Sequence, residues 1–122
     1  MGGAGGGSCG WHDYQGMHNV SGDSSIFELV DFTSQAGSVT STITLPTAVP
    51  GAQFRLFDVD YAAGQFADRV TVTGSFNGTN VTPVLTNGTA NYVIGSTAYG
   101  DVLSADASAD GTVTVTFAAP VD

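Results

Sequence analysis

Apolar and hydroxyl-bearing residues alternate along short stretches of the chain. The clearest stretch, residues 38–45, places Val39, Ile43 and Leu45 at alternate positions between threonines. A period of two is typical of a β-strand that has one face in a core and the other in water. Clusters of Gly, Pro, Asn and Asp separate these stretches and predict turns.

The same pattern predicts about eight short strands and no helix. Two residues of the type that favours a tight hairpin, Asn77 and Gly78, lie between two of the predicted strands. We therefore predict an all-β fold, an antiparallel two-sheet sandwich of the jelly-roll or immunoglobulin-like kind. The predicted strands are residues 25–32, 38–45, 53–60, 69–76, 81–85, 90–94, 98–104 and 112–117.

The alternation also predicts which side chains fill the core between the sheets. The expected inward-facing residues are Phe27, Leu29, Val39, Ile43, Leu45, Phe54, Leu56, Val70, Val72, Val84, Ile94, Leu103, Val113, Val115 and Phe117.

Residues 1–22 are rich in glycine, and their apolar residues follow neither the period of two of a strand nor the period of 3.6 of a helix. We interpret them as an irregular N-terminal arm that precedes a β-sandwich domain over residues 23–122. Ordering a run of glycines costs much backbone entropy, so we expect the arm to be mobile unless Trp11, Tyr14 and Met17 anchor it.

Charge narrows the classes of partner. The chain has 11 acidic residues, two arginines and no lysine, for a net charge of −9. This charge disfavours binding to nucleic acid and to anionic membrane surfaces, and no apolar run reaches the length of a membrane span. The single Cys9 excludes a disulfide within the chain.

Three segments resemble a known kind of module. Residues 54–60 (Phe-Arg-Leu-Phe-Asp-Val-Asp), residues 65–74 (Gln-Phe-Ala-Asp-Arg-Val-Thr-Val-Thr-Gly) and residues 111–117 with Pro120-Val121 resemble a β-sandwich module of large bacterial surface and secreted, adhesin-like proteins. The resemblance extends over residues 23–122. It implies a non-enzymatic structural or adhesive module, located outside the cell or on its surface, whose secretion signal is not within this chain.

Two alternatives remain beside that function. One is a carbohydrate-binding module. The other is a self-assembling subunit of a filament or virion surface, because modules of this type continue with a further strand where this chain ends at Asp122. The open sheet edge that results, or the N-terminal arm, would then pair with another copy and form a homo-oligomer.

Acidic residues supply one candidate site. Asp58 and Asp60 are two residues apart on a predicted strand, so their carboxylates are expected on one face, with Asp68 after the next turn. In one interpretation the three carboxylates bind Ca²⁺. In the other they cap turns and form ion pairs with Arg55 or Arg69. The later Asp101, Asp106 and Asp110 allow the same two interpretations.

Aromatic residues supply the second candidate site. Trp11, Tyr61, Tyr92 and Tyr99 would bind a glycan or a protein partner if exposed together, and would otherwise cover the edges of the core. Cys9, His12 and His18 have the atom types of a zinc site, but their spacing matches no paired ligand motif. No nucleophile elbow or phosphate loop is present, so we predict no enzymatic activity.

Overall fold

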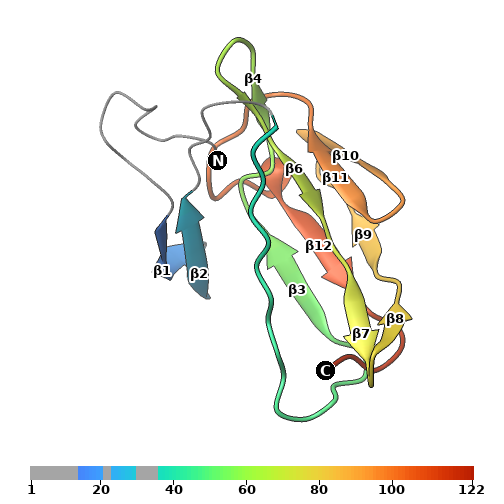
Figure 1. The fold of residues 1–122 in the computed structure, drawn as a ribbon. Coiled ribbons are helices and arrows are strands. Elements are labelled where there is room, and N and C mark those ends of the chain that lie inside the picture. Colours follow the sequence, from blue (N-terminus) through green and yellow to red (C-terminus); the bar gives the residue numbers. More distant parts are fainter. Residues whose placement is uncertain (1–13, 21–22, 30–35) are drawn as a thin grey trace.

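The computed structural model describes residues 14–20, 23–29 and 36–122 (Figure 1). All regular structure in these residues is β-strand, apart from one short 3-10 helix, η2 (Ala109–Gly111). The predicted all-β class is therefore confirmed. The strands are β1 (Tyr14–Val20), β2 (Asp23–Leu29), β3 (Gln53–Leu56), β4 (Tyr61–Ala62), β5 (Phe66–Ala67), β6 (Arg69–Thr71), β7 (Gly74–Phe76), β8 (Thr79–Val81), β9 (Val84–Thr86), β10 (Asn91–Ile94), β11 (Thr97–Gly100) and β12 (Val113–Thr116). Within the described ranges, no helix has the length and apolar character needed to cross a bilayer.

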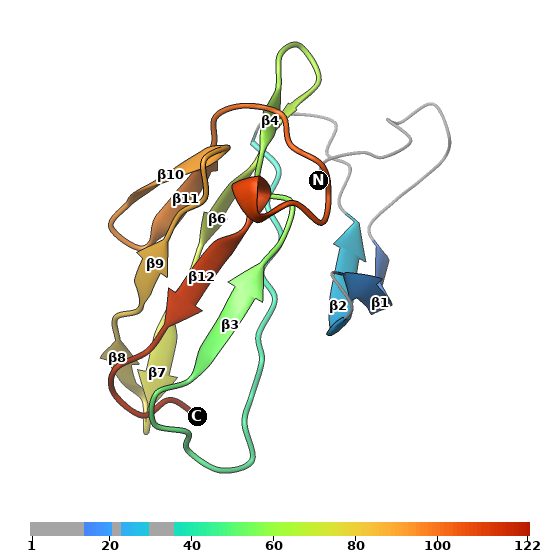
Figure 2. The same ribbon diagram turned by 180° about the vertical axis from the view of Figure 1, so that it is seen from behind.

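The strands form several small antiparallel sheets. Two of the sheets described have three strands, in the orders β3-β12-β9 and β10-β11-β6. β12 and β11 are their central strands, and Figure 2 shows β12 lying between β3 and β9. The pairs β1-β2, β4-β5 and β7-β8 form two-stranded ribbons.

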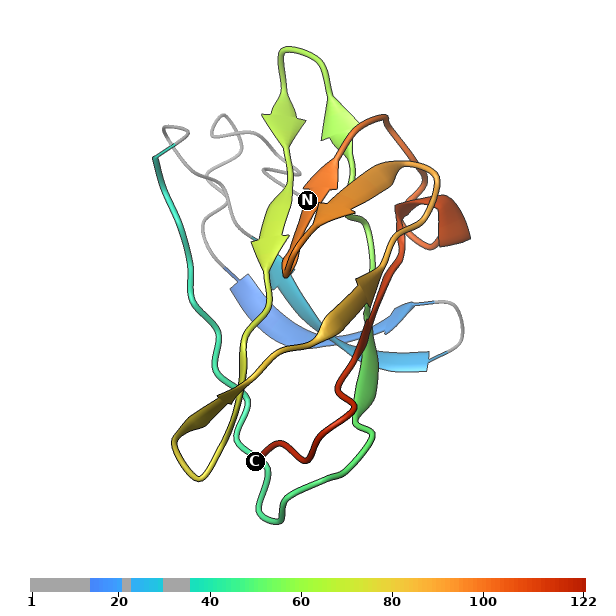
Figure 3. The ribbon, with the colours of Figure 1, turned by 90° about the vertical axis from the view of Figure 1, so that its right-hand side faces the viewer.

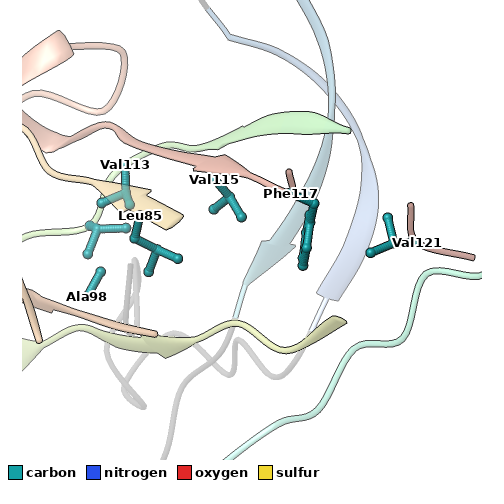
Figure 4. Packing of buried hydrophobic residues seen from close by; sticks show 7 residues of the cluster. Leu85, Ala98, Val113, Val115, Phe117 and Val121 are labelled. Atoms are coloured by element: carbon teal, nitrogen blue, oxygen red, sulfur yellow. The ribbon is translucent and has the colours of Figure 1, made fainter. Parts of the chain in front are cut away.

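Side chains from both three-stranded sheets share one core. Val113 and Val115 of β12 are fully buried and belong to one cluster with Leu85 of β9 and Ala98 of β11. Figure 4 shows Val113, Leu85 and Ala98 at one end of this cluster, with Phe117 toward the other end. The partly buried residues packed against the cluster include the predicted core residues Leu45, Leu56, Val70 and Val72.

The predicted core is wrong at six positions, which the structure exposes: Val39, Ile43, Phe54, Val84, Ile94 and Leu103. At two of them the strand faces the opposite way. Val115 pairs with Leu85, so Leu85 points inward in place of Val84, and Val93 pairs with the buried Ala98 in place of Ile94. A shift of one residue turns every side chain of a strand to the other face. The predicted core residues Phe27 and Leu29 lie on β2, whose side chains are outside the described residues.

Residues 38–45 depart most from the prediction, because none of them belongs to a strand. Leu45 donates its N–H to the carbonyl of Asp122 at 2.6 Å, and Val49 pairs with Val121 as an isolated bridge. Alternation specifies which face a strand would bury. The strand itself forms only where the backbone of a neighbouring segment supplies a regular series of hydrogen bonds.

The N-terminal region also differs from the irregular arm expected over residues 1–22. Tyr14–Val20 is strand β1 and pairs with β2 over its whole length, from Tyr14 opposite Leu29 to Val20 opposite Asp23. Partner pairing supplies the order that the glycine-rich composition does not indicate.

The hairpin predicted at Asn77 and Gly78 is present. Both residues have positive φ, 50° and 77°, and Phe76 pairs with Thr79 on either side of them. Two successive positive φ angles are those of a type I′ turn, which Asn-Gly favours.

Candidate functional site

The acidic candidates and Tyr61 lie at one end of the molecule, which we call the loop end, whereas Tyr92 and Tyr99 lie on strands β10 and β11. The loop end comprises residues 57–68, which contain the β4–β5 hairpin, together with residues 87–91 and 100–111. Figure 3 shows the β4–β5 hairpin at this end and the C-terminus at the opposite one.

Asn91 holds two loops of this end together. Its side chain is 4% exposed. The Nδ2 atom donates to the carbonyl of Val59 at 2.9 Å, and Oδ1 accepts the N–H of Gly88 at 2.9 Å. One buried amide therefore satisfies a donor and an acceptor of two loops that are remote in sequence.

Asp60 joins a third loop to these two. Its side chain is 1% exposed, and Oδ2 accepts the N–H of Ser104 at 2.8 Å. The other carboxylate oxygen, Oδ1, is buried and has no hydrogen-bond partner. The backbone N–H of Asp60 lies 3.3 Å from Oδ2 of Asp68. Asp60 and Asp68 are therefore neighbours, as the predicted acidic site requires.

Asp58 lies on the same segment in a different conformation. β3 ends at Leu56, and Asp58 has a φ of 62°, so the expectation that Asp58 and Asp60 share one face of a strand does not hold. The pKa of the Asp58 carboxyl is raised from 3.8 to about 6, mainly by burial and to a lesser extent by the negative charges of Asp106, Asp60 and Asp68.

Asp58→Asn is expected to stabilise the protein above pH 6 when a chelator is present. A raised pKa means that the folded state favours the protonated carboxyl. The contribution of Asp58 to the free energy of unfolding is therefore fully present below about pH 4 and is lost as the pH rises through about 6. Asparagine is neutral at every pH and also tolerates positive φ. The midpoint of thermal unfolding should therefore rise at pH 7.5 and stay nearly unchanged at pH 4.

The exposed Asp101→Asn is the control for this prediction, because it removes one negative charge from the same end of the molecule. An equal gain for the two variants at pH 7.5 would mean that net charge, and not the burial of Asp58, sets the effect.

The later acidic candidates, Asp101, Asp106 and Asp110, are all exposed. Oδ1 of Asp110 accepts the hydroxyl of Thr89 at 2.7 Å and so links two loops 21 residues apart, which is not the turn role that the sequence predicted. Across residues 36–122, no group of three or more His, Cys, Asp or Glu side chains is already arranged around a metal position.

Each arginine lies beside an aromatic residue. The guanidinium of Arg55 lies 5.0 Å from the centre of the Phe57 ring. Arg69 is exposed and pairs across the strands with Tyr99.

Two of the predicted aromatic residues form a stack. Tyr92 and Tyr99 face each other across β10 and β11, with ring centres 5.1 Å apart and planes inclined by 14°. Tyr92 is 44% exposed. Parallel stacking covers one face of each ring, so the pair does not form a coplanar platform.

Tyr61 lies near two further exposed apolar residues. The sequence indicated Tyr61 as a candidate site residue but not the other two. Tyr61, Val102 and Leu103 are 38%, 52% and 67% exposed, and the N–H of Tyr61 donates to the carbonyl of Val102 at 3.3 Å. We call these three residues the apolar tip. A signal for it was present, because the adjacent Val102 and Leu103 interrupt the alternation within residues 98–104.

The other candidates are outside the described structure. Trp11, Cys9 and His12 lie outside the described residues, and of His18 only the backbone, in β1, is described.

The described residues define an all-β protein of small antiparallel sheets with a closely bonded loop end. No protein-family model, no curated protein and no solved structure matches the chain.

Proposed function

We propose that this chain is a non-enzymatic structural and adhesive module of a bacterial extracellular assembly, in which the small sheets form a two-layer sandwich and the loop end contacts a partner. The apolar tip carries the proposal. Its three exposed apolar residues lie on two segments joined by a backbone hydrogen bond, and exposed apolar residues beside polar ones are the usual composition of the centre of a contact surface.

The rigidity of the loop end supports the same function. The carbonyl of Val102 accepts the N–H of Tyr61, and the next residue, Ser104, donates its backbone N–H to Asp60. The tip is therefore fixed from both sides before any partner arrives. A preformed contact surface loses little conformational entropy on binding, which favours affinity.

The test replaces the tip with polar residues. The double variant Val102→Ser with Leu103→Ser should keep its thermal unfolding midpoint within about 2 °C, since both side chains are exposed in the fold. It should lose at least about tenfold in affinity for whatever the wild type binds, because exposed apolar anchors dominate such contacts. Light scattering over a concentration series measures self-association, and a glycan array measures carbohydrate binding.

Val84→Ser is the matched control. Val84 is 63% exposed, close to the 67% of Leu103, but lies on β9 and not in the tip. A wild-type chain that stays monomeric and binds no glycan or protein would contradict the adhesive function, and so would binding that the double variant retains.

A carbohydrate-binding module is the second candidate, favoured by Tyr92, which is 44% exposed although it stacks on Tyr99. The exposed ring of Tyr92 offers one face to a sugar. Tyr92→Ala would then abolish glycan binding, whereas the tip variant would leave it unchanged.

A further inference from the structure

The Asp60 carboxylate is incompletely satisfied for a group so deeply buried. Its side chain is 1% exposed, and Oδ2 has Ser104 as its partner, while Oδ1 has none. Burying a carboxylate is costly unless it is paired or coordinates a cation. In native structures, a buried polar atom without a partner commonly marks the position of an ion or an ordered water.

Further carboxylates lie on the same segment as Asp60 and next to its backbone. Oδ2 of Asp68 is 3.3 Å from the N–H of Asp60, and Asp58 is two residues earlier on the same segment. The loop end contains carboxylates, carbonyls and hydroxyls, but no histidine or cysteine. Oxygen ligands suit a hard cation, and Ca²⁺ accepts six to eight of them in flexible geometry.

We propose that the loop end binds one calcium ion, with Oδ1 of Asp60 as its central ligand and the carboxylates of Asp68 and Asp58 beside it. Three side chains are not already arranged around a metal position in the described residues, so carboxylates move inward on binding while carbonyls and water complete the shell. The ion would join the segment of residues 58–60 to Asp68 and, through Asp60, to Ser104. This binding does not depend on the proposed adhesive function.

The experiment uses the full chain after removal of metal with a chelator. Thermal unfolding and titration calorimetry are measured with CaCl₂, with MgCl₂ and with neither. Calcium at about 100 times its dissociation constant should raise the unfolding midpoint by roughly 5 °C or more. Magnesium should have a smaller effect, because it demands a tighter octahedral shell.

Variants locate the ion. Asp60→Asn and Asp68→Asn should each abolish the calcium-dependent rise, while the exposed Asp101→Asn keeps it. If Asp60→Asn does not fold, Asp68→Asn decides the question. The proposal is overturned if calcium produces neither binding heat nor a rise of the unfolding midpoint in the wild type. It is also overturned if Asp68→Asn responds to calcium as fully as the wild type and the control Asp101→Asn do.

Discussion

Gly100→Ala is expected to destabilise the protein by about 3 kcal/mol or more, a large share of the roughly 5–15 kcal/mol by which ordinary domains are stable. Gly100 ends β11 where its backbone lies against that of Asp60. A Cβ atom at this position would overlap the carbonyl group of Asp60 and lie 2.9 Å from its Cα. These are backbone atoms held by the loop-end hydrogen bonds, so they cannot move aside as the end of a flexible side chain would. Chemical denaturation measures the free energy of unfolding.

Gly95→Ala is the control for this substitution. Gly95 lies in the turn between β10 and β11, has a φ of 61°, and has open space around the position of a Cβ. The Gly95→Ala variant should lose about 1 kcal/mol in free energy of unfolding, the cost of placing a side chain at positive φ. Equal losses for the two variants would show that the contact with Asp60 has no special weight.

The alternation of the sequence was sufficient to predict strands, but it did not determine their register. The threonines at alternate positions in residues 112–117 correctly predict that Val113, Val115 and Phe117 are buried. Val84 and Ile94 show the limit, because each has an apolar neighbour, Leu85 or Val93, that fits the inward face equally well. Pairing with β12 and β11 decides between the neighbours, and that information is not local.

Residues 38–45 show the same limit for the existence of a strand. They have the clearest alternation in the chain, but none of them belongs to a strand, and Leu45 and Val49 bond to the C-terminal residues. Turn chemistry is more reliable, since the positive φ angles of Asn77 and Gly78 follow from those two residues alone.

The candidate site was predictable in its residue types and less so in its geometry. Asp60 and Asp68 are close, as spacing suggested. The strand ends at Leu56, however, and Asp58 has a positive φ, so Asp58 and Asp60 do not lie on one face of a strand. Asn91 was missed entirely. An asparagine within a predicted strand indicates nothing in particular until tertiary structure brings Val59 and Gly88 to its two amide atoms.

Asn91→Ala is therefore the second substitution with a large expected effect. It leaves the buried carbonyl of Val59 without its partner, at a cost of about 1–3 kcal/mol, and the part-buried N–H of Gly88 without its partner, at the low end of the same range. A total loss of roughly 2–4 kcal/mol follows, because the deleted side chain is too large for the two loops to close over without strain.

Asn87→Ala separates this network from a general effect of asparagine at the loop end. Asn87 is exposed and donates to the carbonyls of Gly88 and Asn91 at 2.7 and 3.1 Å, and water can replace it at both. Its loss should be below about 1 kcal/mol by chemical denaturation. Amide hydrogen exchange supplies a second measurement, since Asn91→Ala should strip protection from the Gly88 N–H whereas Asn87→Ala should leave it. If Asn91→Ala is no more costly than Asn87→Ala, the buried amide does not hold the loops together, and the rigidity attributed to the loop end has another source.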